Sequence, residues 1–179
     1  MNTSTTIMID NINYNLLSEG ANGQVVELNS TSCAKIFELG EASREADLMQ
    51  KANSINDLLC KFIRVEITSE YSKELLVMER LFPLQYRAIT ISEREQFFDK
   101  FLSELKELHS NGFAHWDVKR PSHVCKSADR LWDNIILTPQ GLRLIDTGNS
   151  VLVDDYDFED AVSEDLQNAM EFKQVFLVP

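Results

Sequence analysis

The stretch that decides the fold runs from Leu108 to Asn149 and reads LHSNGFAHWDVKRPSHVCKSADRLWDNIILTPQGLRLIDTGN. A loop with Asp117 and Lys119 comes first, and two apolar runs, Ile135–Leu137 and Leu142–Ile145, follow around a Pro-Gln-Gly turn. Short apolar runs on either side of such a turn predict a two-stranded hairpin. Acidic, amide and ammonium groups around a hairpin suit phosphoryl transfer, because that reaction needs an oriented hydroxyl, neutralised phosphate charge and Mg²⁺ held by oxygen ligands.

This segment resembles the catalytic and metal-binding loops of the protein kinase family. His-Trp-Asp-Val-Lys at 115–119 stands where the family has His-Arg-Asp-Leu-Lys, and Asp-Thr-Gly at 146–148 stands where it has Asp-Phe-Gly. The roles that the resemblance implies are proton acceptor from the substrate hydroxyl for Asp117, neutraliser of the transferring phosphate for Lys119, and Mg²⁺ ligand for Asn134 and Asp146.

Two departures from the family pattern affect these assignments. The family's metal-binding Asn follows its catalytic Asp by five residues, but Ser122 stands there, and an insertion at about 121–132 moves the nearest Asn to Asn134. We prefer Asn134 because it begins the predicted hairpin, and Ser122 stays open as the alternative. The insertion itself could be a disordered excursion or a docking surface. Trp116 replaces the family's Arg, so we do not expect control by a phosphorylated activation loop.

Length and composition limit the range of possible functions. With 179 residues, of which 44% are hydrophobic, the chain can fold into one globular core or two small lobes sharing a cleft. A formal net charge of −12 argues against nucleic acid or an anionic membrane as the main partner. A basic or polar protein is the more plausible partner.

The cysteines and the N-terminus bear on the compartment. Cys33, Cys60 and Cys125 are an odd number at unrelated spacings, which is typical of reduced cytosolic thiols and not of a disulfide framework or a zinc site. No apolar run approaches the roughly 20 residues of a membrane helix, and no signal peptide is visible. Residues 1–13 are polar and lack Lys and Arg, so we expect a flexible terminus that could serve as a secretion signal.

The N-terminal half carries a second group of motifs. Alternating residues from Tyr14 to Phe37 predict strands around Gly20 and Gly23, a turn that resembles the kinase glycine-rich loop. Cys33-Ala34-Lys35 resembles the strand whose lysine grips the α and β phosphates of ATP. A helix expected over 41–52 presents Glu45 as the best partner for Lys35, with Glu41 and Glu38 as alternatives.

Two further strands, expected at 62–68 and 74–78, lead into a segment that resembles the adenine-reading hinge of the kinase family. The resemblance implies that Met78 is the gatekeeper, that Glu79 offers a carbonyl and that Leu81 offers an amide. The residues that it places on the two faces of the adenine ring are Val25 and Cys33 above and Leu137 below.

The C-terminal half is expected to be helical. A capping-box pattern at Ser92–Glu95 predicts the start of a long amphipathic helix that ends at Asn111-Gly112, directly before the catalytic segment. The acidic run at 154–160 is interpreted as a solvated loop, and a final helix is expected over 163–175. Asp165 resembles the buried acid with which the family's corresponding helix holds the catalytic loop, and His115 is expected to orient that loop.

Together these features predict an α+β, two-lobed fold with a small β-rich N-lobe at 14–81 and a truncated helical C-lobe at 82–179. The implied activity is that of a minimal serine/threonine protein kinase that uses ATP and Mg²⁺. Similar truncation is seen in type III secreted effector kinases of the OspG and NleH kind, which implies secretion by a bacterium into a host cytoplasm, a host protein substrate and an activating host protein.

Two other readings stay open. Small-molecule phosphotransferases of the aminoglycoside or choline kinase kind share the His-x-Asp and Asp-x-Gly layout, but a lysine two residues after the Asp, as at Lys119, is typical of protein kinases. A partner-binding pseudokinase is the second alternative, and the displaced Asn134 is the feature that favours it.

Overall fold

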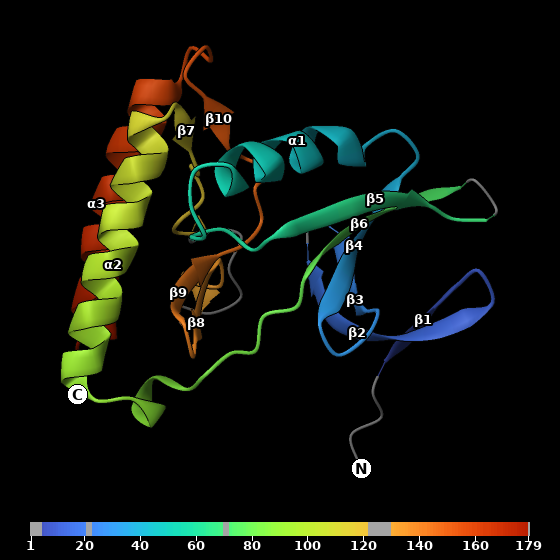
Figure 1. Ribbon diagram of the computed structural model, residues 1–179, viewed down its shortest axis with the longest axis horizontal. Coiled ribbons are helices and arrows are strands. Elements are labelled where there is room, and N and C mark those ends of the chain that lie inside the picture. The colour runs from blue at the N-terminus through green and yellow to red at the C-terminus, as the bar shows by residue number, and fades with distance from the viewer. Residues whose placement is uncertain (1–4, 21–22, 70–71, 122–129, 179) are drawn as a thin grey trace. The chain divides into compact units, whose positions relative to one another are not determined.

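The computed structural model describes residues 5–20, 23–69, 72–121 and 130–178, and these residues form an α+β protein (Figure 1). Its largest sheet has six antiparallel strands, and three α-helices are present in the described ranges. Two compact units can be distinguished: residues 1–50 with 60–81, and residues 51–59 with 82–179. The alternative ligand Ser122 and the thiol Cys125 lie outside the described residues.

Unit 1 is built on the six-stranded sheet, whose strand order is β1-β2-β3-β4-β6-β5. One face of it carries an apolar core of Ile9, Val26, Ala34, Leu75 and Val77. Because side chains alternate along a strand, neighbouring residues such as Lys35 and Leu76 point to the other face, where helix α1 begins. The element bounds are β1 Thr6–Ile9, β2 Ile12–Gly20, β3 Gly23–Glu27, β4 Ser32–Glu38, α1 Ala42–Asn53, β5 Phe62–Ile67 and β6 Lys73–Glu79.

The N-terminal residues form structure where we expected flexibility. β1 pairs with β2 antiparallel, and Ile9 lies opposite Ile12, so the connection has only two residues. Those residues, Asp10 and Asn11, have φ angles of 50° and 63°, which is the conformation of a tight hairpin turn. The prediction of a flexible terminus is therefore wrong for residues 5–13: their polar composition reflects turn chemistry, and Ile9 anchors the hairpin in the core.

Unit 2 is mainly helical. Helices α2 and α3 run side by side (Figure 1), with a ring contact between Phe101 and Phe172 at 6.3 Å between centroids. None of the helices in the described part of the chain has the length and apolar character needed to cross a membrane. The bounds are η1 Tyr86–Ala88, α2 Ile91–Ser110, β7 Phe113–Ala114, β8 Ile135–Thr138, β9 Gly141–Leu144, β10 Val151–Leu152 and α3 Phe158–Phe176.

Both long helices begin earlier than expected. Thr90, and not Ser92, is the N-cap of α2: its hydroxyl accepts a hydrogen bond from Glu93 N, and the Glu93 carboxylate accepts one from Thr90 N at 2.7 Å. Two overlapping capping-box patterns are present, and the earlier one is used. α3 begins at Phe158, inside the acidic run taken for a loop, because Phe158 is buried and acidic side chains stabilise a helix N-terminus.

Candidate functional site

Unit 1 brings the predicted pair of Lys35 and Glu45 together. The Lys35 ammonium, on β4, lies 2.8 Å and 3.0 Å from the two carboxylate oxygens of Glu45 in the first turn of α1. The residues are only 5% and 6% exposed. Of the two alternatives, Glu38 pairs instead with Lys73, and Glu41 is exposed. Burying an ion pair costs desolvation energy that an apolar pair would avoid, so its presence points to a role for the charges themselves.

The glycine turn lies close to this lysine. Gly20 is paired with Gly23 at the end of the β2–β3 hairpin, and Val25 is the register partner of Lys35. Gly23 has φ +116°, and a Cβ at this position would approach the Ile36 carbonyl oxygen to 3.2 Å. A side chain at Gly23 is thus disfavoured both by backbone conformation and by space. Residues 21 and 22 at the tip lie outside the described part of the chain.

The predicted hinge has a contact that sequence reasoning missed. The Glu79 carbonyl oxygen accepts a hydrogen bond from the Cys60 thiol, with the sulfur at 3.1 Å, and Cys33 Sγ lies 3.6 Å from the same oxygen. Cys33 is the register partner of Met78, so the structure brings three of the predicted adenine-site residues together. Burial raises the pKa of the Cys33 thiol to about 11. Leu81, the last residue of unit 1, is partly buried.

Unit 2 gathers the other predicted residues around Asp117. The Asn134 side-chain amide donates a hydrogen bond to the Asp117 backbone carbonyl at 2.8 Å, and Asn149 donates one to the Asp117 carboxylate at 3.3 Å. Burial raises the pKa of Asp117, and the negative charge of Asp146 raises it too, while His115 and the Asn134 side chain act in the opposite direction. Asp117, Asn134 and Asp146 therefore form one polar cluster, although the sequence separates them.

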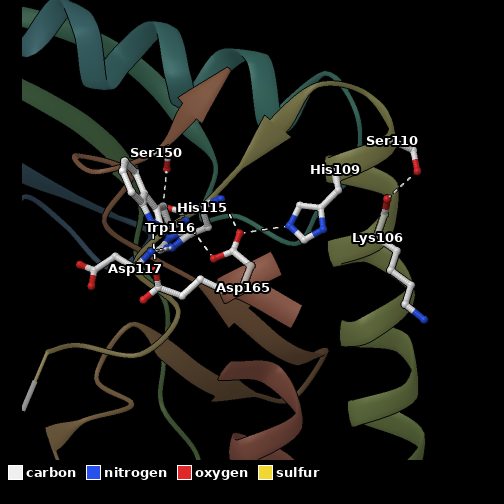
Figure 2. A network of polar contacts seen from close by, with 9 residues as sticks. Lys106, His109, Ser110, His115, Trp116, Asp117, Ser150 and Asp165 are labelled. Atoms are coloured by element: carbon white, nitrogen blue, oxygen red, sulfur yellow. Dashed lines mark hydrogen bonds and ion pairs between the residues drawn. The ribbon is translucent and has the colours of Figure 1, made fainter. Parts of the chain in front are cut away.

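A buried carboxylate holds the loop that carries Asp117 (Figure 2). Asp165 on α3 is fully buried and accepts hydrogen bonds from His115 N at 2.8 Å and Trp116 N at 2.9 Å, and it lies 3.1 Å from His109 Nε2. This contact with the backbone of the loop is the one predicted for Asp165. Trp116 has φ +57°, which is an unusual conformation for a bulky residue. The two amides that Asp165 holds are that of Trp116 itself and that of His115 before it.

His115 ties the same loop to the neighbouring hairpin. Its Nδ1 accepts a hydrogen bond from Asp117 N at 3.3 Å, so its Nε2 carries the proton and donates to the Ile145 carbonyl at 3.0 Å. The Ser150 hydroxyl donates to the His115 carbonyl at 3.1 Å (Figure 2). His115 is completely buried and serves to orient the loop.

The donor set at Asn134 and Asp146 fits Mg²⁺. Ile145 N donates to the Asn134 carbonyl at 3.0 Å, so the hairpin register puts Asn134 beside the residue that precedes Asp146. The Asn134 amide nitrogen donates to the Asp117 carbonyl, so only its side-chain oxygen could serve as a ligand atom. No group of three or more His, Cys, Asp and Glu side chains suited to a metal occurs in the described ranges. Mg²⁺ needs no such cage, because it binds through one or two carboxylates plus water and phosphate oxygens.

Lys119 has a partner that sequence reasoning did not foresee. Its ammonium lies 2.5 Å from the Glu171 carboxylate on α3 and 5.5 Å from the centroid of the Trp132 ring.

Leu137, the predicted lower adenine contact, is buried on β8, and its carbonyl accepts a hydrogen bond from Leu84 N at 2.8 Å. Contacts of this kind depend on which elements pack together, and no local sequence pattern signals them.

Comparison of the sequence with protein families and with curated proteins found no match.

Proposed function

We propose that this chain is a minimal protein serine/threonine kinase that transfers the γ-phosphate of ATP in the presence of Mg²⁺. The observation that carries the proposal is the cluster of Asp117, Asn134 and Asp146 in unit 2. A buried network that orients one carboxylate, with an amide oxygen and a second carboxylate beside it, supplies both a proton acceptor and oxygen ligands. Phosphoryl transfer uses little else from a protein besides positioning and charge neutralisation.

Asp117 acts in this proposal as the acceptor of the proton from the substrate hydroxyl. A general base must keep its position when the substrate arrives, and two sets of contacts hold this one. Asp165 fixes the amides of the two residues before it, and His115 accepts the hydrogen bond of its own amide. The loop backbone is therefore held on both sides of Trp116, and Asn149 donates a hydrogen bond to the carboxylate itself.

Lys35 has the second role, neutralising the phosphates that are not transferred. Glu45 holds the ammonium in place, which reduces the entropy that a flexible lysine would lose on meeting a phosphate. Mg²⁺ ions, bound through Asn134 and Asp146, would supply the remaining positive charge.

We prefer a protein acceptor over a small molecule because a lysine two residues after the Asp, as Lys119 stands to Asp117, is typical of protein kinases. That the acceptor is a host protein, that a host protein activates the enzyme and that a bacterium secretes it are parts of the proposal that rest on the kinase resemblance alone.

The test is phosphate transfer from γ-labelled ATP to proteins of a host cell extract. We expect Lys35→Met and Asp117→Asn each to lower labelling at least about a hundredfold, while the exposed control Asp160→Asn keeps it. Asn134→Ala should cost much more activity than Ser122→Ala if the insertion is placed correctly. Full turnover in Lys35→Met or Asp117→Asn would overturn the proposal. Labelling of a sugar or an aminoglycoside would favour the small-molecule phosphotransferase, and absence of nucleotide binding would favour the pseudokinase.

A further inference from the structure

Unit 2 contains a cavity that adjoins the proposed phosphoryl-transfer residues, with Lys119 and Leu137 in its lining. Its volume is about 930 Å³, and it lies among the segment before η1, residues 131–133, strand β8 and the C-terminal part of α3. Trp132, Ile136 and Val175 contribute apolar walls, and Lys119 and Glu171 contribute charge. Cavities of this size with mostly apolar walls and a few polar groups are typical binding sites.

The charged pair in the cavity wall is exposed enough to be exchanged. The side chains of Lys119 and Glu171 are 31% and 41% exposed. Ion pairs with this degree of exposure contribute little net stability, because solvent screens them and two long side chains must be ordered. Replacing one cation by another at Glu171 therefore has a small energetic cost.

The cavity is also continuous with the catalytic loop. Lys119 lines it and stands two residues after Asp117. While its ammonium contacts Glu171 and the Trp132 ring, it is held in the cavity wall and cannot serve a phosphate. Any occupant that takes over Glu171 would release the lysine for the role proposed above.

The charges of the wall select the kind of occupant. When Lys119 leaves, the Glu171 carboxylate can pair with a cation of the occupant. Asp133, the third charged residue of the lining, is already paired with Arg130 at 2.8 Å. An anionic occupant would meet two carboxylates and compete with phosphate for Lys119. The formal net charge of −12 disfavours it further.

We propose that this cavity docks a segment of the acceptor protein in which an aromatic or aliphatic side chain adjoins an arginine or lysine. The apolar side chain enters between Trp132 and Val175, and the cation pairs with Glu171 in place of Lys119. That the partner is the phosphate acceptor and that Lys119 gains a catalytic role rest on the proposed kinase function, whereas the binding of such a segment in the cavity does not.

Docking is tested on the full chain without nucleotide. The probes are two dye-labelled peptides in a Gly-Ser background, one with Phe followed by Arg and the other with Phe followed by Glu. Fluorescence anisotropy is followed with protein up to about 1 mM, the range expected for so small a contact. We expect the Arg peptide to bind the wild type about fivefold more tightly than the Glu peptide, and Glu171→Lys to reverse that order.

A matched pair of α3 variants tests the apolar wall. Val175 lines the cavity and is 51% exposed, whereas Met170 is 47% exposed and does not line it. Because both side chains are exposed, Val175→Asn and Met170→Asn should both fold. Val175→Asn removes an apolar wall without adding charge and is expected to weaken binding of the Arg peptide at least about fivefold, and Met170→Asn to leave it unchanged.

Three results would overturn the docking proposal: no binding of either peptide at about 1 mM protein, an unchanged peptide preference in Glu171→Lys, or equal effects of Val175→Asn and Met170→Asn. Release of Lys119 is read separately from its acetylation by acetic anhydride, which should rise when the Arg peptide saturates the cavity and stay constant with the Glu peptide. If the charge swap succeeds while no variant transfers phosphate, the docking site stands and the kinase function fails.

Discussion

Replacing Asp165 by Asn tests how the catalytic loop is held. The carboxylate accepts hydrogen bonds from His115 N, Trp116 N and His109 Nε2, at distances of 2.8, 2.9 and 3.1 Å. An Asn amide has one acceptor oxygen, so in either orientation its NH₂ group faces a backbone N–H. One buried amide then loses its acceptor, and the hydrogen bonds that remain lose their charge.

The structure sets the size of this effect. A buried donor without a partner costs about 1–3 kcal/mol, and the loss of charge costs about 1 kcal/mol for each of the two remaining hydrogen bonds. We therefore expect Asp165→Asn to lower the free energy of unfolding by about 3–5 kcal/mol. Phosphate transfer by the folded variant should fall as well, because the amides that become free directly precede Asp117.

Urea unfolding followed by tryptophan fluorescence measures this change. Both tryptophans of the chain, Trp116 and Trp132, belong to unit 2, so the signal reports the unit that contains Asp165. Asp99→Asn makes the same chemical change at an exposed position in the interior of α2 and should stay within about 0.5 kcal/mol of the wild type. A similarly small change for Asp165→Asn would refute the view that this carboxylate holds the loop.

Two further predictions concern a helix start and a thiol. Thr90→Ala should lower the free energy of unfolding by about 1 kcal/mol and Ser92→Ala by much less, since only Thr90 caps α2; equal losses in urea unfolding would contradict this cap. Because burial raises the pKa of Cys33 from 9.0 to about 11, its thiolate fraction at pH 8 is about a hundredfold below that of an unperturbed thiol. Iodoacetamide should therefore modify Cys33 slowly in the folded protein, as quantified by mass spectrometry, and faster as the pH rises toward 11; modification at the rate of the urea-unfolded chain would reject the burial argument.

Local sequence patterns were sufficient to predict several elements that position the candidate site residues. The β8–β9 hairpin follows from two apolar runs around a turn, and α1 begins and ends within one residue of the expected 41–52. Glu45 could be chosen for Lys35 because helix periodicity puts Leu48 and Met49, both buried, on the inward side with it. The predicted role of Asp165 in holding the loop backbone agrees with its contacts, but that prediction came from the kinase resemblance and not from a local pattern.

Other features could not be predicted because they depend on competition or on distant partners. Two capping boxes overlap at the start of α2, and nothing local decides between Thr90 and Ser92. Polar residues at the N-terminus suit a disordered tail as well as a tight turn, and only the packing of Ile9 against the sheet distinguishes the two. Lys119 meets Glu171 on a helix far along the chain, and that choice of partner requires the packed structure.

The central claim is the proposed binding of ATP, with Lys35 next to its phosphates and Asp146 as a ligand of its Mg²⁺. An ATP derivative with an acyl group on its terminal phosphate tests this most directly, because it acylates amines that lie next to the bound phosphates. We predict that Lys35 is acylated in the presence of Mg²⁺, that excess ATP prevents the reaction, and that Asp146→Asn lowers it at least about tenfold because a Mg²⁺ ligand is lost. Labelling of Lys35 that is absent, insensitive to ATP or unchanged in Asp146→Asn would contradict the account.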